Sequence, residues 1–235
     1  MLKGNITDYL FLDIETVPEY ASYSEVPGNI KELWDKKSAY QRKQDETAEE
    51  FYPKAGIWAE FGRIICISCG FVDANRILRI KTFFDEDEKE LLLNFSAMLS
   101  RFFQSRTYPR LCGHNGKEFD FPYIARRMLI NSLILPSALD VSKLKPWEVP
   151  FEDTLEMWKF GDHKHYCSLE LLATIFGIPT PKDDIDGSMV AKIYYEENDI
   201  NRIVKYCEKD VITLVQLFLK LTQQQPFNDI VFVDK

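Results

Sequence analysis

The stretch YLFLDIET, residues 9–16, decides the fold predicted for this chain of 235 residues. Strand side chains alternate between two faces, so Asp13 and Glu15 share one face and the residue between them, Ile14, points to the other. The run before them is apolar on both faces, which is typical of a central strand covered on both sides. Two carboxylates at the end of such a strand are costly to desolvate, and a hard cation with oxygen ligands removes that cost. The alternative is a strand end that dips into solvent.

Composition favours a soluble globular protein. Hydrophobic residues make up 46% of the chain and charged residues 28%, which are ordinary shares for a globular domain. The short apolar run near the N-terminus is followed at once by acids, so we expect neither a signal peptide nor a membrane-spanning helix. We therefore expect a cytoplasmic protein with no membrane partner. One domain over residues 1–235 is the economical prediction.

Charge and cysteine usage narrow the function classes. The net charge of −8 argues against tight, nonspecific binding to duplex DNA through a large basic face. It leaves room for a nucleic acid held in a short groove with the help of metal ions. The five cysteines are expected as reduced thiols. Cys66 and Cys69 lie in a strand pattern and would face opposite ways, so a metal site between them is not expected; His163 and His165 are expected in a turn or exposed to solvent.

The order of β-type and helical patterns predicts an α/β fold. Strands at 63–72 and 77–84 flank a turn, so with the first strand they predict three consecutive antiparallel strands. Helices are expected at 85–104 (with Asp85 as N-cap), 121–131, 168–176, 188–197 and 199–222, short strands at 110–112 and within 150–160, a turn at 182–188 and an apolar tail at the C-terminus. Strands first and helices interleaved later indicate a mixed sheet flanked by helices.

Residues 18–58 change character and form a polar, charged excursion directly after the acidic strand end. Helical stretches are expected at 29–38 and 45–52. The excursion is either a flap beside the strand end or an ordinary helical excursion over the surface. We expect it to influence which substrates reach the strand end.

The last helix supplies a third acid. Asp210 lies beside the apolar side of this helix, and Tyr206 precedes it by one turn on the same face. A carboxylate in that place needs a partner, either a metal shared with Asp13 and Glu15 or a neighbouring lysine. The apolar stripe comprises Ile200, Ile203, Cys207, Val211, Leu214 and Phe218.

A fourth acid, Asp120, lies between the turn GHNG (residues 113–116) and a helix with Pro122 in its first turn. Aspartate is a favoured N-cap, so Asp120 taken alone is explained by helix capping. Taken with the acids of the first strand and the last helix, it is a candidate metal ligand.

Three motifs come in a recognisable order: D-x-E at Asp13, N-x3-F-D from Asn115 to Asp120, and Y-x3-D at Tyr206. The chain resembles the DEDD 3′–5′ exonucleases, in the tyrosine (DEDDy) branch. It is most similar to the proofreading exonuclease domain of family B DNA polymerases and to stand-alone bacterial relatives of that domain. GHNGKEFDFPYIARR and IVKYCEKDVITLV support the resemblance, which spans residues 9 to about 220 and implies an RNase H-like fold. The excursion departs from the pattern.

The resemblance implies two-metal chemistry, in which paired divalent ions activate the attacking water and stabilise the leaving oxygen. Carboxylates with retained waters suit two Mg²⁺ or Mn²⁺ ions per site. Asp13, Glu15 and Asp210 would hold the metal on the nucleophile side. Asp13 would bridge to the second metal, Asp120 would hold that one partly through water, and Tyr206 would orient the attacking water.

The resemblance also implies substrate contacts. Thr16 and Asn115 would touch the terminal nucleotide, and Phe119 would stack on a base or pack in the core. Asp153 is either a fifth, accessory acid or a turn or strand cap. Three basic residues would contact phosphates or lie on a solvated helix face: Lys117, Arg126 and Arg127.

The leading hypothesis is thus a metal-dependent 3′–5′ exonuclease that acts on single-stranded 3′ ends, DNA favoured, and releases 5′-mononucleotides. One alternative is the same chemistry on RNA, because recognition of the 2′-OH depends on pocket shape. The other is a non-catalytic nucleic-acid-binding module on the same fold. We expect no polymerase domain in this chain, and protein partners are unknown.

Overall fold

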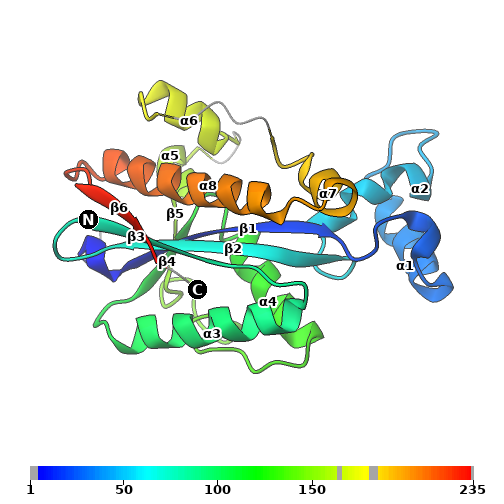
Figure 1. Ribbon diagram of the computed structural model, residues 1–235, viewed down its shortest axis with the longest axis horizontal. Helices are drawn as coiled ribbons and strands as arrows, with labels where there is room; N and C mark the ends of the chain where they lie inside the picture. Colours follow the sequence, from blue (N-terminus) through cyan, green and yellow to red (C-terminus); the bar gives the residue numbers. More distant parts are fainter. Residues whose placement is uncertain (1–4, 163–165, 180–184, 234–235) are drawn as a thin grey trace.

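The computed structural model describes residues 5–162, 166–179 and 185–233. The predictions for His163 and His165, and the first half of the turn at 182–188, lie outside these residues. The core is a six-stranded sheet in the order β5-β4-β1-β2-β3-β6, with helices on both faces (Figure 1). The predicted α/β fold, a mixed sheet flanked by helices, is confirmed.

The sheet combines antiparallel and parallel pairs. β1, β2 and β3 form the predicted antiparallel meander. β4 pairs parallel with β1, and β5 pairs parallel with β4. The apolar C-terminal tail forms one more strand, β6, which pairs parallel with β3. The strands are β1 (Tyr9–Pro18), β2 (Gly62–Val72), β3 (Ile77–Phe83), β4 (Arg110–Gly113), β5 (Phe151–Asp153) and β6 (Asp229–Phe232).

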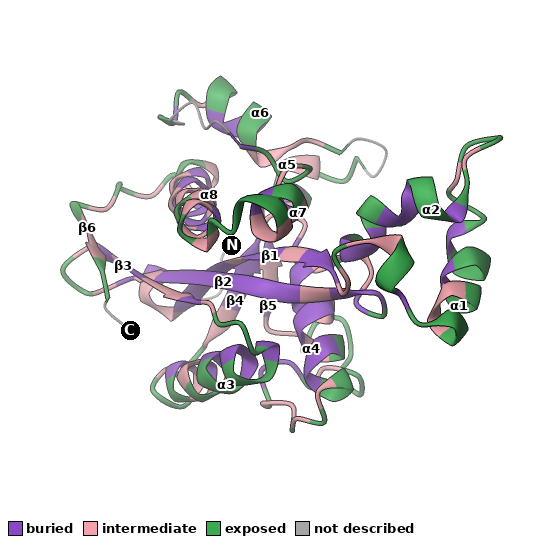
Figure 2. Ribbon diagram, turned by 45° about the vertical axis from the view of Figure 1, so that its right-hand side comes forward, coloured by how far each residue is buried: buried purple, intermediate pink, exposed green. Residues whose placement is uncertain are grey.

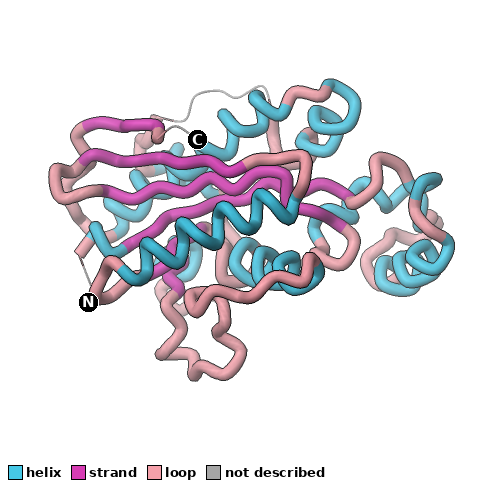
Figure 3. Tube along the Cα trace, turned by 60° about the horizontal axis from the view of Figure 1, so that its bottom comes forward, coloured by secondary structure: helices cyan, strands magenta, loops and turns pink. Residues whose placement is uncertain are grey.

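The helices form two layers. α3 and α4 cover one face of the sheet (Figures 1 and 3). α8 lies along the other face, and α5, α6 and α7 lie on that same side of the sheet (Figure 1). Among the described residues, no helix combines the length and apolarity needed to cross a bilayer. The helices are α1 (Gly28–Ser38), α2 (Ala48–Phe51), α3 (Glu88–Gln104), α4 (Asp120–Ile130), α5 (Thr154–Lys159), α6 (Leu169–Ile175), α7 (Val190–Lys192) and α8 (Ile200–Leu221).

Two helix predictions are wrong in detail. The N-cap of α3 is Asp87, whose side chain accepts a hydrogen bond from the Lys89 N–H, and Asp85 instead caps the preceding turn by accepting from the Asp87 N–H. The helix predicted at 188–197 is a short α-helix followed by a π-helical turn, Ile193–Glu197, in which the Asn198 N–H bonds to the Ile193 carbonyl. Apolar spacing of three and four residues does not distinguish these two kinds of turn.

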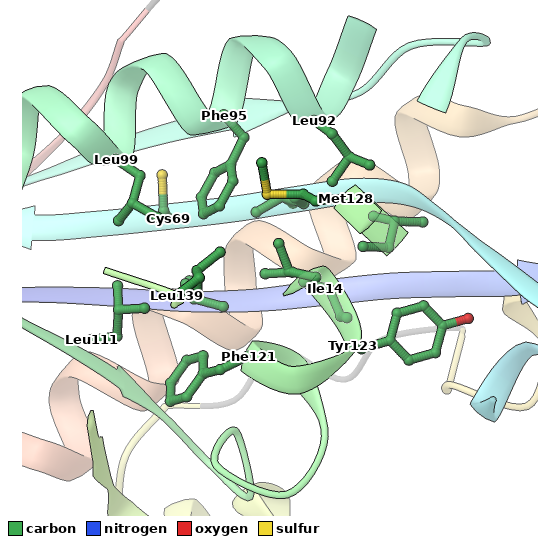
Figure 4. Packing of buried hydrophobic residues seen from close by; sticks show 14 of the residues in the cluster. Ile14, Cys69, Leu92, Phe95, Leu99, Leu111, Phe121, Tyr123, Met128 and Leu139 are labelled. Carbon is green, nitrogen blue, oxygen red and sulfur yellow. The ribbon is translucent and has the colours of Figure 1, made fainter. Parts of the chain in front are cut away.

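The first strand separates the two layers as its alternation predicts. Leu10, Leu12 and Ile14 belong to the apolar cluster under α3 and α4 (Figure 4). Phe11 points the other way and packs on Phe218 of α8, with 5.1 Å between ring centroids. The odd-numbered residues of β1 therefore face α8, and the two carboxylates follow Phe11 along that face.

A β-bulge follows the acids. Glu15 pairs with Cys66, but Thr16 pairs with Ile64, so Ile65 is the extra residue of β2. As a result Ile65 and Cys66 both pack on the α8 side of the sheet. Cys69 packs on the α3 side, which confirms that Cys66 and Cys69 face opposite ways. All five cysteines are free thiols.

The excursion has an apolar cluster of its own. Trp34 of α1 is fully buried at its centre, and its indole Nε1–H donates to the Ala48 carbonyl at 2.7 Å. α1 and α2 project beyond one end of the sheet, and most of their outer surface is exposed (Figures 1 and 2). The aromatic rings around Trp34 are Phe51, Tyr52, Trp58 and Phe61, with centroids 5.3–6.0 Å away.

The ends of the excursion are fixed to the sheet layers by Arg127 of α4. Its guanidinium donates to the Glu19 carboxylate and to the Ala59 carbonyl, each at 2.9 Å. It also forms a salt bridge with Glu88 in which both side chains are 6% exposed. The prediction of a phosphate contact or a solvated face is therefore wrong for Arg127, although Arg126 is exposed. Helical spacing does not reveal that a charged residue has buried partners on two other segments.

Candidate active site

Carboxylates from three elements meet on the α8 side of β1. Asp13 and Glu15 come from β1, Asp120 from the first residue of α4, and Asp210 from the middle of α8. The charges of Asp120 and Asp210 act on both Asp13 and Glu15. The structure therefore brings together all four acids that the sequence singles out.

Asp120 is held against the backbone of β1. Its Oδ1 accepts a hydrogen bond from the Ile14 N–H at 3.1 Å, and the side chain is buried. The N-cap of α4 is Phe119, so the alternative in which Asp120 serves only as a helix cap does not match the structure. Its carboxylate is oriented toward the strand between the two acids of β1.

The first half of α8 places two further groups. The helix packs on β1 and β2 through the predicted stripe, of which Ile203, Cys207 and Val211 are fully buried. Tyr206 and Asp210, one turn apart, form a hydrogen bond between their side chains. Both are half-buried, so this pair lies at the edge of the stripe, next to the β1 carboxylates.

The proximity of the four acids disturbs their ionisation. Burial, and then the charges of neighbouring carboxylates, raise the pKa values of Asp13 and Glu15 well above the usual range. Burial raises the pKa of Asp120 to about 7. Burial and the charges of Asp210 and Glu15 also raise the pKa of Tyr206. The phenol therefore stays protonated at neutral pH, and the carboxylates need either protons or cations.

One residue at this cluster is missed by the sequence reading. The Sγ of Cys207 lies within 4.8 Å of ligand atoms of Asp13 and Glu15, a grouping that can hold a metal ion. Its thiol is 3.5 Å from Asp13 Oδ2 and 3.4 Å from the Asp13 carbonyl. The apolar stripe alone explains Cys207 as a packing residue. Its position directly after Tyr206 and three residues before Asp210 was the sequence signal that it lies near the cluster.

The turn after β4 is organised by Asp153. This carboxylate accepts hydrogen bonds from the backbone N–H of Asn115 at 2.9 Å, of Lys117 at 3.1 Å and of Leu155 at 2.9 Å. Asn115 adopts a left-handed conformation with φ of 64°, which asparagine tolerates better than most residues. Of the two alternatives for Asp153, the geometry matches the cap: it fixes the turn that leads to Asp120.

The other predicted substrate contacts lie around this turn and the strand end. The Thr16 hydroxyl donates to the Gly56 carbonyl at 2.8 Å, so it faces the excursion. The ring of Phe119 is half-buried and lies 5.3 Å from that of Tyr123. The Lys117 ammonium is paired with Glu156 of α5 at 2.6 Å. Each side chain therefore has a protein partner in this structure.

The hydrogen bonds of His114 join the turn to the chain that follows α5. Nδ1 lies 2.9 Å from the Thr154 hydroxyl, and Nε2 lies 2.8 Å from the Cys167 carbonyl. Burial lowers the pKa of His114, so the ring is neutral at pH 7. A neutral ring with both nitrogens occupied has a structural role here.

Comparisons with known proteins agree with this geometry. Residues 57–227 match the family model described as a predicted 3′–5′ exonuclease related to the exonuclease domain of PolB. Among solved structures, the chain is similar to the family B DNA polymerase from the hyperthermophilic archaeon Pyrobaculum calidifontis, with a TM-score of 0.58 and 16% sequence identity. The similarity covers 91% of this chain and 24% of the polymerase chain, and it shows a shared fold. A search of curated proteins gave no match. The chain belongs to the family of predicted 3′–5′ exonucleases related to the exonuclease domain of PolB.

Proposed function

We propose that this protein is a metal-dependent 3′–5′ exonuclease that removes 5′-mononucleotides from single-stranded DNA ends. The observation that carries the proposal is the convergence of Asp13, Glu15, Asp120 and Asp210, from three elements, on one face of the sheet. Structural ion pairs would place cations among such acids. Here the largest effects on the pKa values of Asp13 and Glu15 are burial and then the charges of neighbouring carboxylates, and all of them raise these values.

The donor set fits divalent cations. Carboxylate oxygens are the ligands that Mg²⁺ and Mn²⁺ prefer. The pKa values of Asp13, Glu15 and Asp120 are raised by burial and by neighbouring carboxylates, and a bound cation would offset both effects. Asp13, Glu15 and Asp210 would hold one ion, and Asp13 and Asp120 a second. When bound, such ions supply a hydroxide-like nucleophile and stabilise the leaving oxygen.

The residues of the chain have separate roles in this proposal. Tyr206 stays protonated because burial and nearby charges raise its pKa, so its hydroxyl can hydrogen-bond to the attacking water without acting as a base. Asp153 orients the turn that carries Asn115, and this turn leads to Asp120. Thr16 and Asn115 would border the terminal nucleotide, with Lys117 and Phe119 on the rim.

The proposal is tested with 3′-labelled oligonucleotides of DNA and RNA, single-stranded and duplex, in Mg²⁺ and in Mn²⁺. Asp13→Asn and Asp210→Asn should each lower the rate of nucleotide release by about a hundredfold or more, because even indirect partners of metal ligands contribute 10–100-fold. Glu90→Gln, which removes an exposed acid from α3 on the opposite face of the sheet, is the matched control for charge removal. Wild-type activity in either aspartate variant would overturn the proposal.

The same assay separates the alternatives. Faster release from RNA than from DNA would identify an exoribonuclease. Binding of single strands without release in either metal would identify a non-catalytic module. The excursion at 18–58 is tested by replacing its outer part, residues 24–46, with a short linker; a changed preference between single-stranded and duplex ends supports our proposal that it governs access.

A further inference from the structure

The carboxylate cluster contains a sulfur atom that the proposed reaction does not use. Cys207 is fully buried, yet its Sγ lies within 4.8 Å of ligand atoms of Asp13 and Glu15. The thiol donates toward Asp13 Oδ2 at 3.5 Å. A thiol directed at a carboxylate that is proposed to bridge two metals is in reach of an ion held by that carboxylate.

A second thiol supports this one. Cys66 lies directly opposite Glu15 in the β1–β2 pairing and packs on the same, α8 side of the sheet. Its side chain hydrogen-bonds with that of Cys207. The sulfur of Cys207 therefore has both a carboxylate pair and a second thiol as neighbours, and the cluster combines hard oxygen and soft sulfur donors.

We propose that Asp13, Glu15 and Cys207 form a binding site for a thiophilic divalent cation, Zn²⁺ or Cd²⁺, that excludes the ions needed for nuclease activity. Zn²⁺ accepts mixed carboxylate and thiolate ligands in a tetrahedral arrangement, whereas Mg²⁺ demands oxygen ligands in an octahedral one. Three protein ligands leave a fourth position for water. When the metal–sulfur bond forms, the thiol proton is released to solvent, and Cys66 can donate its S–H to the resulting thiolate.

As a consequence, this cluster should bind Zn²⁺ and Cd²⁺ in preference to Mg²⁺. Soft ligands favour Zn²⁺ and Cd²⁺, and affinity for a given site rises from Mn²⁺ towards the later metals. An ion held by Cys207 occupies the Asp13 and Glu15 oxygens that the proposed nuclease ions need. Zn²⁺ should therefore compete with Mg²⁺ and inhibit. This inference deepens the proposed function, because it uses the same two carboxylates.

The test is a titration of the full-length, metal-free protein with Cd²⁺, followed by the ultraviolet sulfur-to-cadmium charge-transfer absorption. We expect a band that saturates with one cadmium per chain. Cys207→Ser should weaken Cd²⁺ binding about tenfold or more and remove the band. Cys69→Ser is the matched control, because Cys69 is also buried but lies on the α3 side, where its thiol donates to the Lys81 carbonyl at 3.2 Å.

A second variant keeps the test decisive if Cys207→Ser fails to fold. Asp13→Asn retains every thiol, and it should also lower the Cd²⁺ affinity if sulfur and carboxylate share one ion. A band of wild-type strength and affinity in Cys207→Ser, or in Asp13→Asn, would overturn the inference. If wild type shows no band but releases nucleotides in Mg²⁺, this inference fails and the proposed function stands. A band without nuclease activity in Mg²⁺ or Mn²⁺ would count against the proposed function alone.

Discussion

The carboxylate of Asp120 accepts a hydrogen bond from the backbone N–H of Ile14, with 3.1 Å between Oδ1 and N. β4 pairs with β1 only as far as Phe11, so strand pairing on that side does not reach Ile14. One side chain thus completes the hydrogen bonding of a buried strand and adds a negative charge beside Asp13 and Glu15.

These two roles of Asp120 can be separated by two substitutions. Asp120→Asn retains an oxygen for the Ile14 N–H and removes one charge from the cluster, so the metal-free variant should be at least as stable as wild type at pH 8. Asp120→Ala leaves a buried donor without a partner and should be less stable than the asparagine variant by about 1–3 kcal/mol. Urea unfolding in a chelator measures both. Equal stability of the two variants would contradict the structural role of this hydrogen bond.

The stability of the metal-free protein should fall as the pH rises from about 5 to 8. The folded state raises the pKa values of Asp13 and Glu15 and that of Asp120 to about 7, so it binds more protons than the unfolded chain in this range. The contribution is fully present below the ordinary carboxyl pKa of about 4 and is lost as the pH passes through about 7. Thermal unfolding with a chelator should show a melting temperature that falls as the pH rises, and saturating Mn²⁺ should remove this fall.

The control for this pH dependence is the double variant Asp13→Asn, Glu15→Gln. It lacks two acids whose pKa values are raised well above the usual range, so its melting temperature should depend less on pH in the chelator and respond less to Mn²⁺. If wild type and the double variant show the same pH dependence, the cluster does not cause it.

The buried salt bridge of Arg127 should matter for stability. Arg127→Ala leaves the Glu88 carboxylate buried without its cation and frees the Ala59 carbonyl, so we expect a loss of about 3–5 kcal/mol. Arg126→Ala, the exposed neighbour, should change stability by about 0.5 kcal/mol or less. Urea unfolding gives both values. An Arg127→Ala protein that keeps its stability but binds oligonucleotides more weakly would instead support the phosphate contact that the sequence offers as one alternative.

Asp153 should act on the turn and leave metal binding intact. Asp153→Ala removes the acceptor for three backbone N–H groups, so stability should fall by about 1–3 kcal/mol while Mn²⁺ still binds with wild-type stoichiometry. Calorimetric titration of the metal-free variant checks this. Loss of one bound ion in Asp153→Ala would show that Asp153 is a fifth ligand.

The strand-period pattern accounts for what could be predicted. Alternation in residues 9–16 is enough to place Asp13 and Glu15 on one face and Ile14 on the other, and a helical stripe is enough to place Asp210 at its edge. These predictions depend on one element each, and the period of the element carries them. The family resemblance then predicts that the acids from these separate elements form one site.

The features that escaped prediction depend on contacts between distant segments. Arg127 looks like an ordinary basic residue of an amphipathic helix until Glu88, 39 positions earlier, is found against it. In the sequence, Cys207 is explained as a packing residue of the last helix. Only the contact between α8 and β1 places its thiol near Asp13 and Glu15. The parallel pairing of β6 with β3 likewise brings together residues that are far apart in the sequence, such as Ile77 and Asp229. Periodicity contains no information about such partners.

The anchoring of the excursion has a consequence for how such proteins can diversify. Its outer helices bury their aromatic residues among themselves around Trp34, and its two ends are tied at Glu19 and Ala59 by a single guanidinium. Closing a longer or shorter loop between two fixed points costs little free energy. The segment is thus an exchangeable module: its length and shape can be altered between the anchors while the strand that carries Asp13 and Glu15 stays in register.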